Sequence, residues 1–161
     1  MAGGVELKLE GFKEMGQRMH DMDEDMRTKL GYRAVARVMR ATKADAEGIL
    51  DSHHFQGNGA MRRNIAIARI KSSSPLAMIY DVGVRHGTKK QIKQTKAEGR
   101  NTNDPWYWVL HEFGFHDRSG KEVGPRPFMT PAFRRRLTDG IEMMADTLRR
   151  GIKKFDKGTT K

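Results

Sequence analysis

The segment from Trp106 to Phe133 constrains the fold of this chain more than any other, because it holds seven of the twelve large aromatic side chains. It reads WYWVLHEFGFHDRSGKEVGPRPFMTPAF. Aromatic side chains each bury a large apolar area, while Pro125 and Pro127 keep the connecting backbone extended and remove two N–H donors. The segment therefore predicts a rigid platform, either in the core or at an interface between subunits. Its candidate anchors are Trp106, Tyr107, Trp108, Phe113, Pro127, Phe128 and Phe133.

Two motifs inside this platform carry a family resemblance. From Tyr107 to Gly114, aromatic residues precede Glu-Phe-Gly, and from Pro125 to Phe133 the chain reads Pro-x-Pro-Phe-x-x-Pro-Ala-Phe. In this order, with a loop between them and a helix after them, the motifs resemble the tail-component family of long-tailed bacteriophages. The loop at 115–124 is a departure, since in that family it is often shorter and carries small polar residues.

The resemblance implies a structural virion protein that completes the neck or the head-proximal end of the tail. Subunits of that family act in rings between the head connector and the tail tube. The implied partners are further copies of this chain in a homo-oligomeric ring, and neighbouring head-connector and tail-terminator or tail-tube proteins. The implied location is the virion, in the neck or tail, after assembly in the host cytoplasm. Genomic DNA in the lumen of such a ring would make only non-specific contacts.

Length and composition bound the class. A chain of 161 residues fits one domain with a single core. It has no cysteine, which excludes disulfides, thiolate metal sites and cysteine nucleophiles. The sequence shows no apolar run near the ~20 residues that cross a bilayer and no signal-peptide pattern at its start, so we expect synthesis in the cytosol and no membrane partner.

The N-terminal part predicts a short strand and a long helical region. Apolar and charged residues alternate at 5–9, the pattern of a half-buried strand, which ends at Gly11. From 12 to 50, apolar residues recur every three or four positions on one Met-rich stripe. A glycine costs a helix ~1 kcal/mol relative to alanine. Gly16 and Gly31 therefore predict a shorter helix followed by a longer one, broken near 21–25 or near Gly31.

The remaining part predicts a loop, a hairpin and a second helix. Turn-forming residues at 57–59 indicate a loop between 51 and 61. Extended patterns at 65–70 and 77–84 flank a polar turn, which indicates a hairpin, and Gly83 marks a bulge or a close backbone approach. An amphipathic helix begins near Thr130 or Pro131. Its expected apolar face consists of Phe133, Leu137, Ile141, Met144, Leu148 and Ile152.

These elements predict an α+β fold in a single domain over 1–161. A small antiparallel sheet packs against the long N-terminal helical region and the C-terminal amphipathic helix. An exposed basic arm at about 85–104 and a basic C-terminal tail at about 153–161 extend from this domain. Part of that tail matches the negative end of the helix dipole.

The net charge of +11 is regional. Residues 1–50 hold nine basic and nine acidic side chains, so the remainder carries the whole excess. The arm contains no large apolar side chain except Ile92 and cannot bury enough surface to order itself. A basic surface of this kind faces either DNA or an acidic protein ring. The candidate inter-ring or DNA-facing residues are Arg85, Lys89, Lys90, Lys93, Lys96 and Arg100.

Motifs for catalysis are missing from the sequence. None of the histidines shows the i, i+4 pairing of a helical zinc site, and there is no glycine-rich phosphate cradle, nucleophile elbow or paired-carboxylate motif. Glu112 lies among aromatic residues, and its expected role is that of a buried partner for an arginine such as Arg126. We therefore expect no catalytic, cofactor or metal residues and no enzymatic activity.

Two other functions account for the charge without a ring. A small basic nucleic-acid-binding protein acting as a monomer or dimer is the main alternative, although the aromatics cluster with apolar residues and are not interleaved with arginines as in a base-stacking platform. A basic nuclease or toxin is the third, and it lacks candidate residues. Portal, connector and tail-tube genes beside this one would favour the virion protein, whereas a gene for an acidic antitoxin-like protein would favour the toxin.

Overall fold

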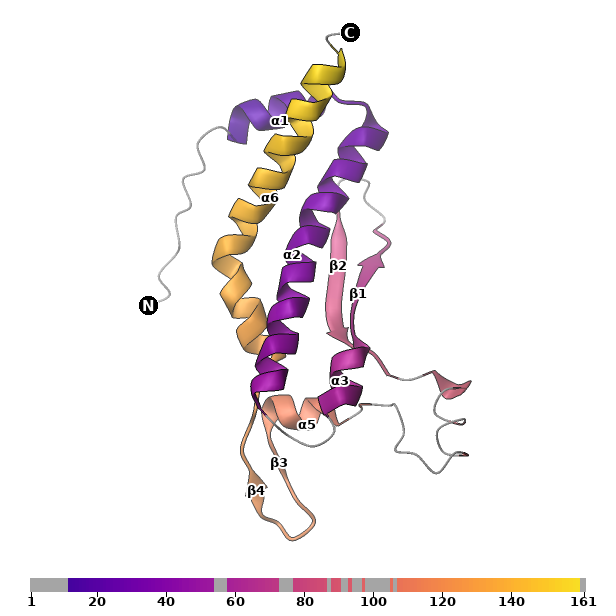
Figure 1. Cartoon of the computed structure of the whole chain (residues 1–161), viewed down its shortest axis with the longest axis vertical. Helices are drawn as coiled ribbons and strands as arrows, with labels where there is room; N and C mark the ends of the chain where they lie inside the picture. The colour runs from indigo at the N-terminus through magenta and orange to yellow at the C-terminus, as the bar shows by residue number, and fades with distance from the viewer. Residues whose placement is uncertain are drawn as a thin grey trace.

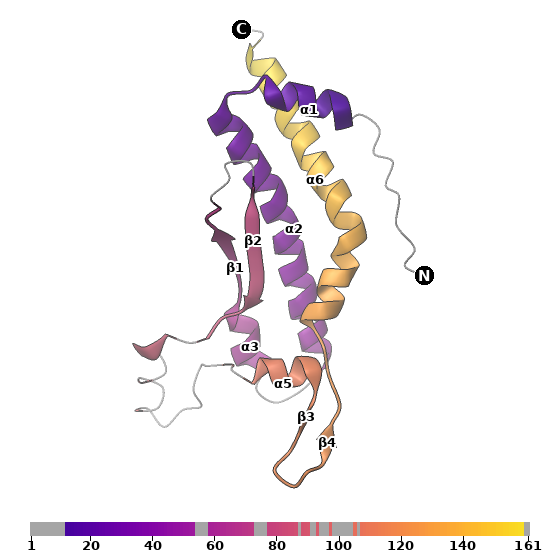
Figure 2. The ribbon, with the colours of Figure 1, turned by 180° about the vertical axis from the view of Figure 1, so that it is seen from behind.

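Two long antiparallel helices with a β-hairpin beside them form the body of the protein (Figure 1). The computed structural model describes residues 12–53, 58–72, 77–86, 88–90, 93, 97, 105 and 107–159. The predicted strand at 5–9 and its end at Gly11 lie outside this range. Helix α2 is central, with α6 on one side and the hairpin on the other, as both ribbon views show (Figures 1 and 2). The predicted α+β fold is confirmed.

The N-terminal helical region breaks at the first of the two predicted places. Three residues separate helix α1 (Phe12–His20) from helix α2 (Glu24–Ser52). Gly31 lies within α2 and does not interrupt it. Its missing side chain makes room for Met78, since a Cβ there would lie 2.1 Å from the Met78 sulfur. The buried stripe of α2 repeats every four residues through Leu30, Ala34, Val38, Thr42, Ala46 and Leu50.

Helix α6 (Met129–Thr159) packs along α2. Gly140 and Gly151 face α2 three turns apart, and a Cβ at Gly151 would lie 2.2 Å from a methyl carbon of Leu30. A bidentate ion pair also joins the two helices. Arg136 Nε and Nη2 of α6 donate hydrogen bonds to the Asp45 carboxylate of α2 at 2.5 and 2.9 Å. The helix begins one residue earlier than the predicted Thr130.

The apolar face predicted for α6 is wrong in its first turns. Phe133 is 39% exposed and Leu137 is 70% exposed, whereas Met129 and Ala132 are buried in their place. Ile152, further along, is buried as predicted. Of the predicted basic tail, residues 153–159 continue α6.

The predicted hairpin is confirmed. Strands β1 (Ile65–Ile70) and β2 (Ile79–Val84) pair antiparallel from Ile65↔Val84 to Ile70↔Ile79. The register runs unbroken through Ala66↔Gly83, so of the two alternatives predicted at Gly83 the bulge is wrong. Near the turn of the hairpin, Tyr80 packs edge-on against Tyr32 of α2 at 5.8 Å between ring centroids.

Short elements connect these units. Helix α3 (Asn58–Asn64) occupies part of the segment predicted as a loop. Helix α5 (Trp108–Phe113) precedes a second small hairpin of β3 (Phe115–His116) and β4 (Glu122–Val123), which was predicted only as a loop. Its turn is held by Asp117, whose Oδ1 accepts hydrogen bonds from the backbone N–H groups of Ser119 and Lys121 at 2.8 and 3.0 Å. Gly120 adopts a φ of 82°, which favours glycine.

The apolar interior forms two clusters at opposite ends of α2. The larger joins α2, α3, the β1–β2 hairpin and the start of α6, with Leu50, Met61, Ile65 and Phe128 at its centre. The smaller joins α1, the start of α2 and the last turns of α6, and consists mainly of methionine, leucine and isoleucine. Phe128 of the aromatic platform therefore belongs to the larger cluster, and Tyr107 and Trp108 pack against it.

Candidate functional site

Glu112 joins the two motifs of the aromatic platform. It lies in α5 and is only 4% exposed, and its carboxylate accepts hydrogen bonds from the first backbone N–H groups of α6. The donors are Phe128 N at 2.9 Å, Met129 N at 3.1 Å and Thr130 N at 2.7 Å. A helix leaves its first four N–H groups unsatisfied, and its N-terminus favours a negative charge. Glu112 therefore caps α6 from a distant position in the sequence.

This capping corrects the role predicted for Glu112. Its burial is confirmed, but the carboxylate accepts hydrogen bonds from the backbone N–H groups of 128–130 and from the Thr130 side chain in place of the predicted Arg126. Arg126 contributes through its own backbone, whose N–H donates to the carbonyl oxygen of His111 at 2.7 Å. Gly114 turns the chain between the two motifs with a φ of 78°, and a Cβ there would lie 2.9 Å from the Val123 carbonyl oxygen.

The capping bonds keep Glu112 ionised. Burial alone raises the pKa of a carboxyl group, but the hydrogen bonds from the Thr130 side chain and from the backbone of 128–130 outweigh it and hold the pKa of Glu112 below its ordinary value. The pKa of the neighbouring His111 is also lowered, by burial and by the nearby Arg126 and His53. For a histidine, a lowered pKa favours the neutral form. At neutral pH the platform thus contains an anionic Glu112 and a neutral His111.

The predicted anchors separate into buried and exposed groups. Phe128 is completely buried, and Tyr107 and Trp108 are half-buried against the larger cluster. Pro127 is exposed, Phe113 is 71% exposed and Phe133 is 39% exposed. The side chain of Trp106 lies outside the described part of the chain. The platform is therefore core on one side and surface on the other.

The exposed side forms an apolar corner, which we define as Trp108, Phe113, Phe133 and Leu137. These side chains line one cavity of about 340 Å³, where α5 meets the first turns of α6. Buried Met129 and Val82 close its inner side. The sequence pattern predicted Leu137 on the buried face of α6, so it did not identify Leu137 as a surface residue. An exposed apolar patch of this kind on a fixed backbone is typical of an interaction site.

The predicted basic arm is only partly within the described residues. Arg85, Lys89, Lys90 and Lys93 are exposed, and Lys89, Lys90 and Lys93 have helical backbone geometry. Arg85 is fixed to the hairpin, because its backbone N–H donates to Asn64 O at 2.9 Å and its guanidinium to Ile67 O at 3.3 Å. Lys96 and Arg100 lie outside the described residues.

Across the residues that the structure describes, no cluster of three or more histidine, aspartate or glutamate side chains could hold a metal ion. No helix in the same ranges is both long and apolar enough to cross a membrane. Comparison of the chain with protein-family models, with curated proteins and with solved structures found no match.

Proposed function

We propose that this chain is a structural virion protein of the phage neck or head-proximal tail end, where its copies form a ring that completes the tail and joins it to the head. The observation that carries the proposal is the pair of motifs at 107–114 and 125–133, which resemble the tail-component family. Their coupling supports it further. Glu112 in the first motif caps the helix that opens the second, so the two motifs act as one structural unit.

The apolar corner supports assembly into a ring. Phe113 and Leu137 are each about 70% exposed although both are large and apolar. Interfaces are enriched in aromatic side chains, and a few such residues contribute most of the binding free energy. A contact between this corner and a different surface of the next copy is heterologous, and repeated contacts of that kind close into a ring when the rotation permits.

The basic arm supports contact with a neighbouring polyanion. Arg85 fixes the root of the arm on the hairpin, and Lys89, Lys90 and Lys93 point their charges into solvent. In a neck, these charges dock an acidic neighbouring ring, and some of them face the genome in the lumen without reading its sequence. We propose no enzymatic role for this chain.

Charging the apolar corner is expected to break the ring. Leu137→Asp places a carboxylate in the proposed contact, whereas Thr138→Asp adds the same charge one position away on α6, at an exposed residue that does not line the cavity. Sedimentation velocity should show the wild type and Thr138→Asp as rings, and Leu137→Asp shifted to smaller species with at least about tenfold weaker assembly. Phe113→Asp, from α5, should behave like Leu137→Asp.

Two results would contradict this proposal. Equal assembly of Leu137→Asp and Thr138→Asp would remove the corner from the interface. A wild type that remains a monomer or dimer, both alone and with neighbouring virion proteins, and that binds duplex DNA with a steep salt dependence would favour the nucleic-acid-binding alternative.

A further inference from the structure

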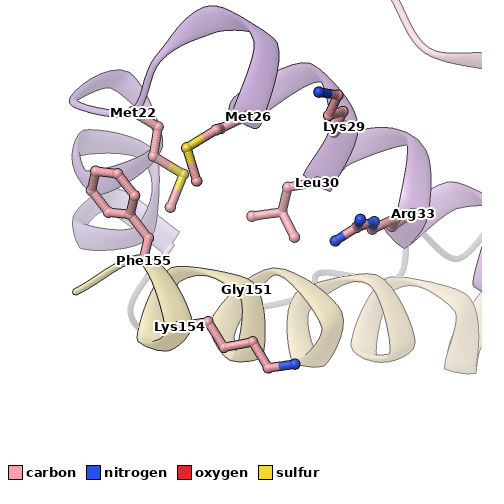
Figure 3. A pocket seen from close by; sticks show the side chains of 8 residues that line it. All are labelled: Met22, Met26, Lys29, Leu30, Arg33, Gly151, Lys154 and Phe155. Atoms are coloured by element: carbon pink, nitrogen blue, oxygen red, sulfur yellow. The ribbon is translucent and has the colours of Figure 1, made fainter. Parts of the chain in front are cut away.

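A second apolar surface lies at the opposite end of the molecule from the apolar corner, between the first turns of α2 and the last turns of α6 (Figure 1). It is a cavity of about 520 Å³ whose apolar walls are Met22, Met26, Leu30 and Phe155 (Figure 3). Gly151 faces Leu30 without a side chain, which brings the two helices close, and both residues line the cavity. We call this cavity, with the basic residues around it, the basic groove.

The basic residues of the groove form two rows. Lys29, Arg33 and Arg37 follow one another at intervals of four along α2, and Arg150 and Lys154 do the same along α6. Residues four apart on a helix lie on one face, about 6 Å from one another. An adjoining cavity of about 400 Å³ shares Leu30, Arg33 and Lys154 and continues the groove between the rows.

The charges of these rows are only partly neutralised. Lys29 is paired with Asp25 on its own helix at 2.5 Å. Arg37 and Arg150 share one carboxylate, that of Asp146.

Arg33 and Lys154 have no ion-pair partner in the part of the chain that the structure describes. Five cations around the groove therefore face two acidic partners, Asp25 and Asp146, and a surplus of positive charge flanks an apolar floor. Three further acidic residues, at 21 and 23 in the α1–α2 turn and at 24 in the first position of α2, flank Met22 in the sequence and do not line the groove.

We propose that the basic groove binds an acidic amphipathic helix of a second protein. Such a helix places apolar side chains at positions three and four apart on the floor and carboxylates one turn apart along each edge, opposite Arg33 and Lys154. Methionine-lined grooves accept helices of this kind because the side chain adapts to different apolar partners. The proposal does not depend on the virion role; in a neck, the helix would belong to the neighbouring ring.

Other occupants fit the groove less well. A fatty acid carries one carboxylate and leaves most of the surplus charge uncompensated. A DNA backbone has no apolar group to cover Met26 and Leu30. In a second copy of this chain, the apolar corner is flanked by Arg134, which lines the cavity there, so it would bring positive charge against positive charge. The acidic residues at 21–25 of a second copy are not the occupant either, because they adjoin the groove of their own chain.

Binding can be measured with a labelled synthetic helix of about 18 residues, or five turns. Its leucines follow the three-and-four spacing, and glutamates flank them; in a second peptide, glutamine replaces every glutamate. We expect the folded full-length protein to bind the glutamate peptide in fluorescence anisotropy, and to bind the glutamine peptide at least about tenfold more weakly. Raised salt should weaken the first interaction most.

The matched variants locate the site. Arg33→Glu with Lys154→Glu should weaken binding of the glutamate peptide at least about tenfold. Arg40→Glu with Lys153→Glu makes the same change in net charge on the same two helices, at exposed residues that do not line the groove, and should stay within about twofold of the wild type. Arg33→Gln with Lys154→Gln should give an intermediate loss and retain the fold, since both side chains are exposed.

Several outcomes would overturn the proposal. Equal affinity for the glutamate and glutamine peptides would show that charge does not select the occupant. Equal losses in the two charge-reversal variants would show a general effect of net charge. Binding of dodecanoate or of a duplex oligonucleotide, with no binding of the glutamate peptide, would assign the groove to a lipid-like molecule or to nucleic acid.

Discussion

Replacing Phe128 by alanine is expected to lower the free energy of unfolding by about 3–5 kcal/mol, as truncation of a buried aromatic does. Phe128 is completely buried where α2, the β1–β2 hairpin and the start of α6 meet, against Leu50, Met61 and Ile65. The cavity left by alanine lies among three elements that cannot all close on it. Urea denaturation with the linear extrapolation measures the change.

Phe113→Ala is the matched control for this prediction. It is the same substitution in the same platform, but Phe113 is 71% exposed, so its free energy of unfolding should change by no more than about 0.5 kcal/mol. If Phe113→Ala destabilises the monomer as much as Phe128→Ala does, the division of the platform into a core side and a surface side is wrong. If Phe113→Ala leaves stability intact and impairs assembly, the surface side is an interface.

Glu112→Gln is expected to lower the free energy of unfolding by about 3 kcal/mol at neutral pH, because buried N–H groups at the start of α6 lose a charged acceptor. Three backbone donors converge on this one carboxylate, and glutamine supplies a single neutral oxygen acceptor. Glu142→Gln, at an exposed position on α6, should change stability by no more than about 0.5 kcal/mol.

The effect of Glu112 depends on pH in a defined direction. The folded-state pKa lies below the unfolded one, so the stabilisation is fully present above the unfolded pKa of ~4.3. It is lost as the pH falls through the lowered folded pKa. Unfolding curves of the wild type and Glu112→Gln should therefore converge in acid and separate on the way to neutral pH. A difference that stays constant over this range would mean that folding does not change the pKa of Glu112, and one that shrinks towards neutral pH would mean that folding raises it.

Local patterns in the sequence were sufficient for the elements that depend on local interactions. The break between α1 and α2 and the β1–β2 hairpin follow from spacing and turn residues, and both are confirmed. The face of α6 could not be predicted in the same way. Two faces of its first turns carry apolar residues at helical spacing, one with Leu137 and one with Met129 and Ala132. Which face is buried depends on where α5 and the hairpin pack.

The Glu112 cap and the basic groove could not be predicted from the sequence, for different reasons. Glu112 caps a helix that starts 17 residues later, so no local capping motif reveals it. Counting charges did not reveal the basic groove, because residues 1–50 hold equal numbers of basic and acidic side chains. Folding separates those charges, with acidic residues at the α1–α2 turn and Lys29, Arg33 and Arg37 along one face of α2.

The most direct test of the proposed function is electron microscopy of virions from a phage whose genome carries this sequence, with a compact density tag fused after α6. We expect the tag to appear as a closed ring at the junction of head and tail. We also expect particles made without this chain to accumulate as separate heads and tails. A tag that is absent from the virions, or that is spread along the tail tube, would contradict the account.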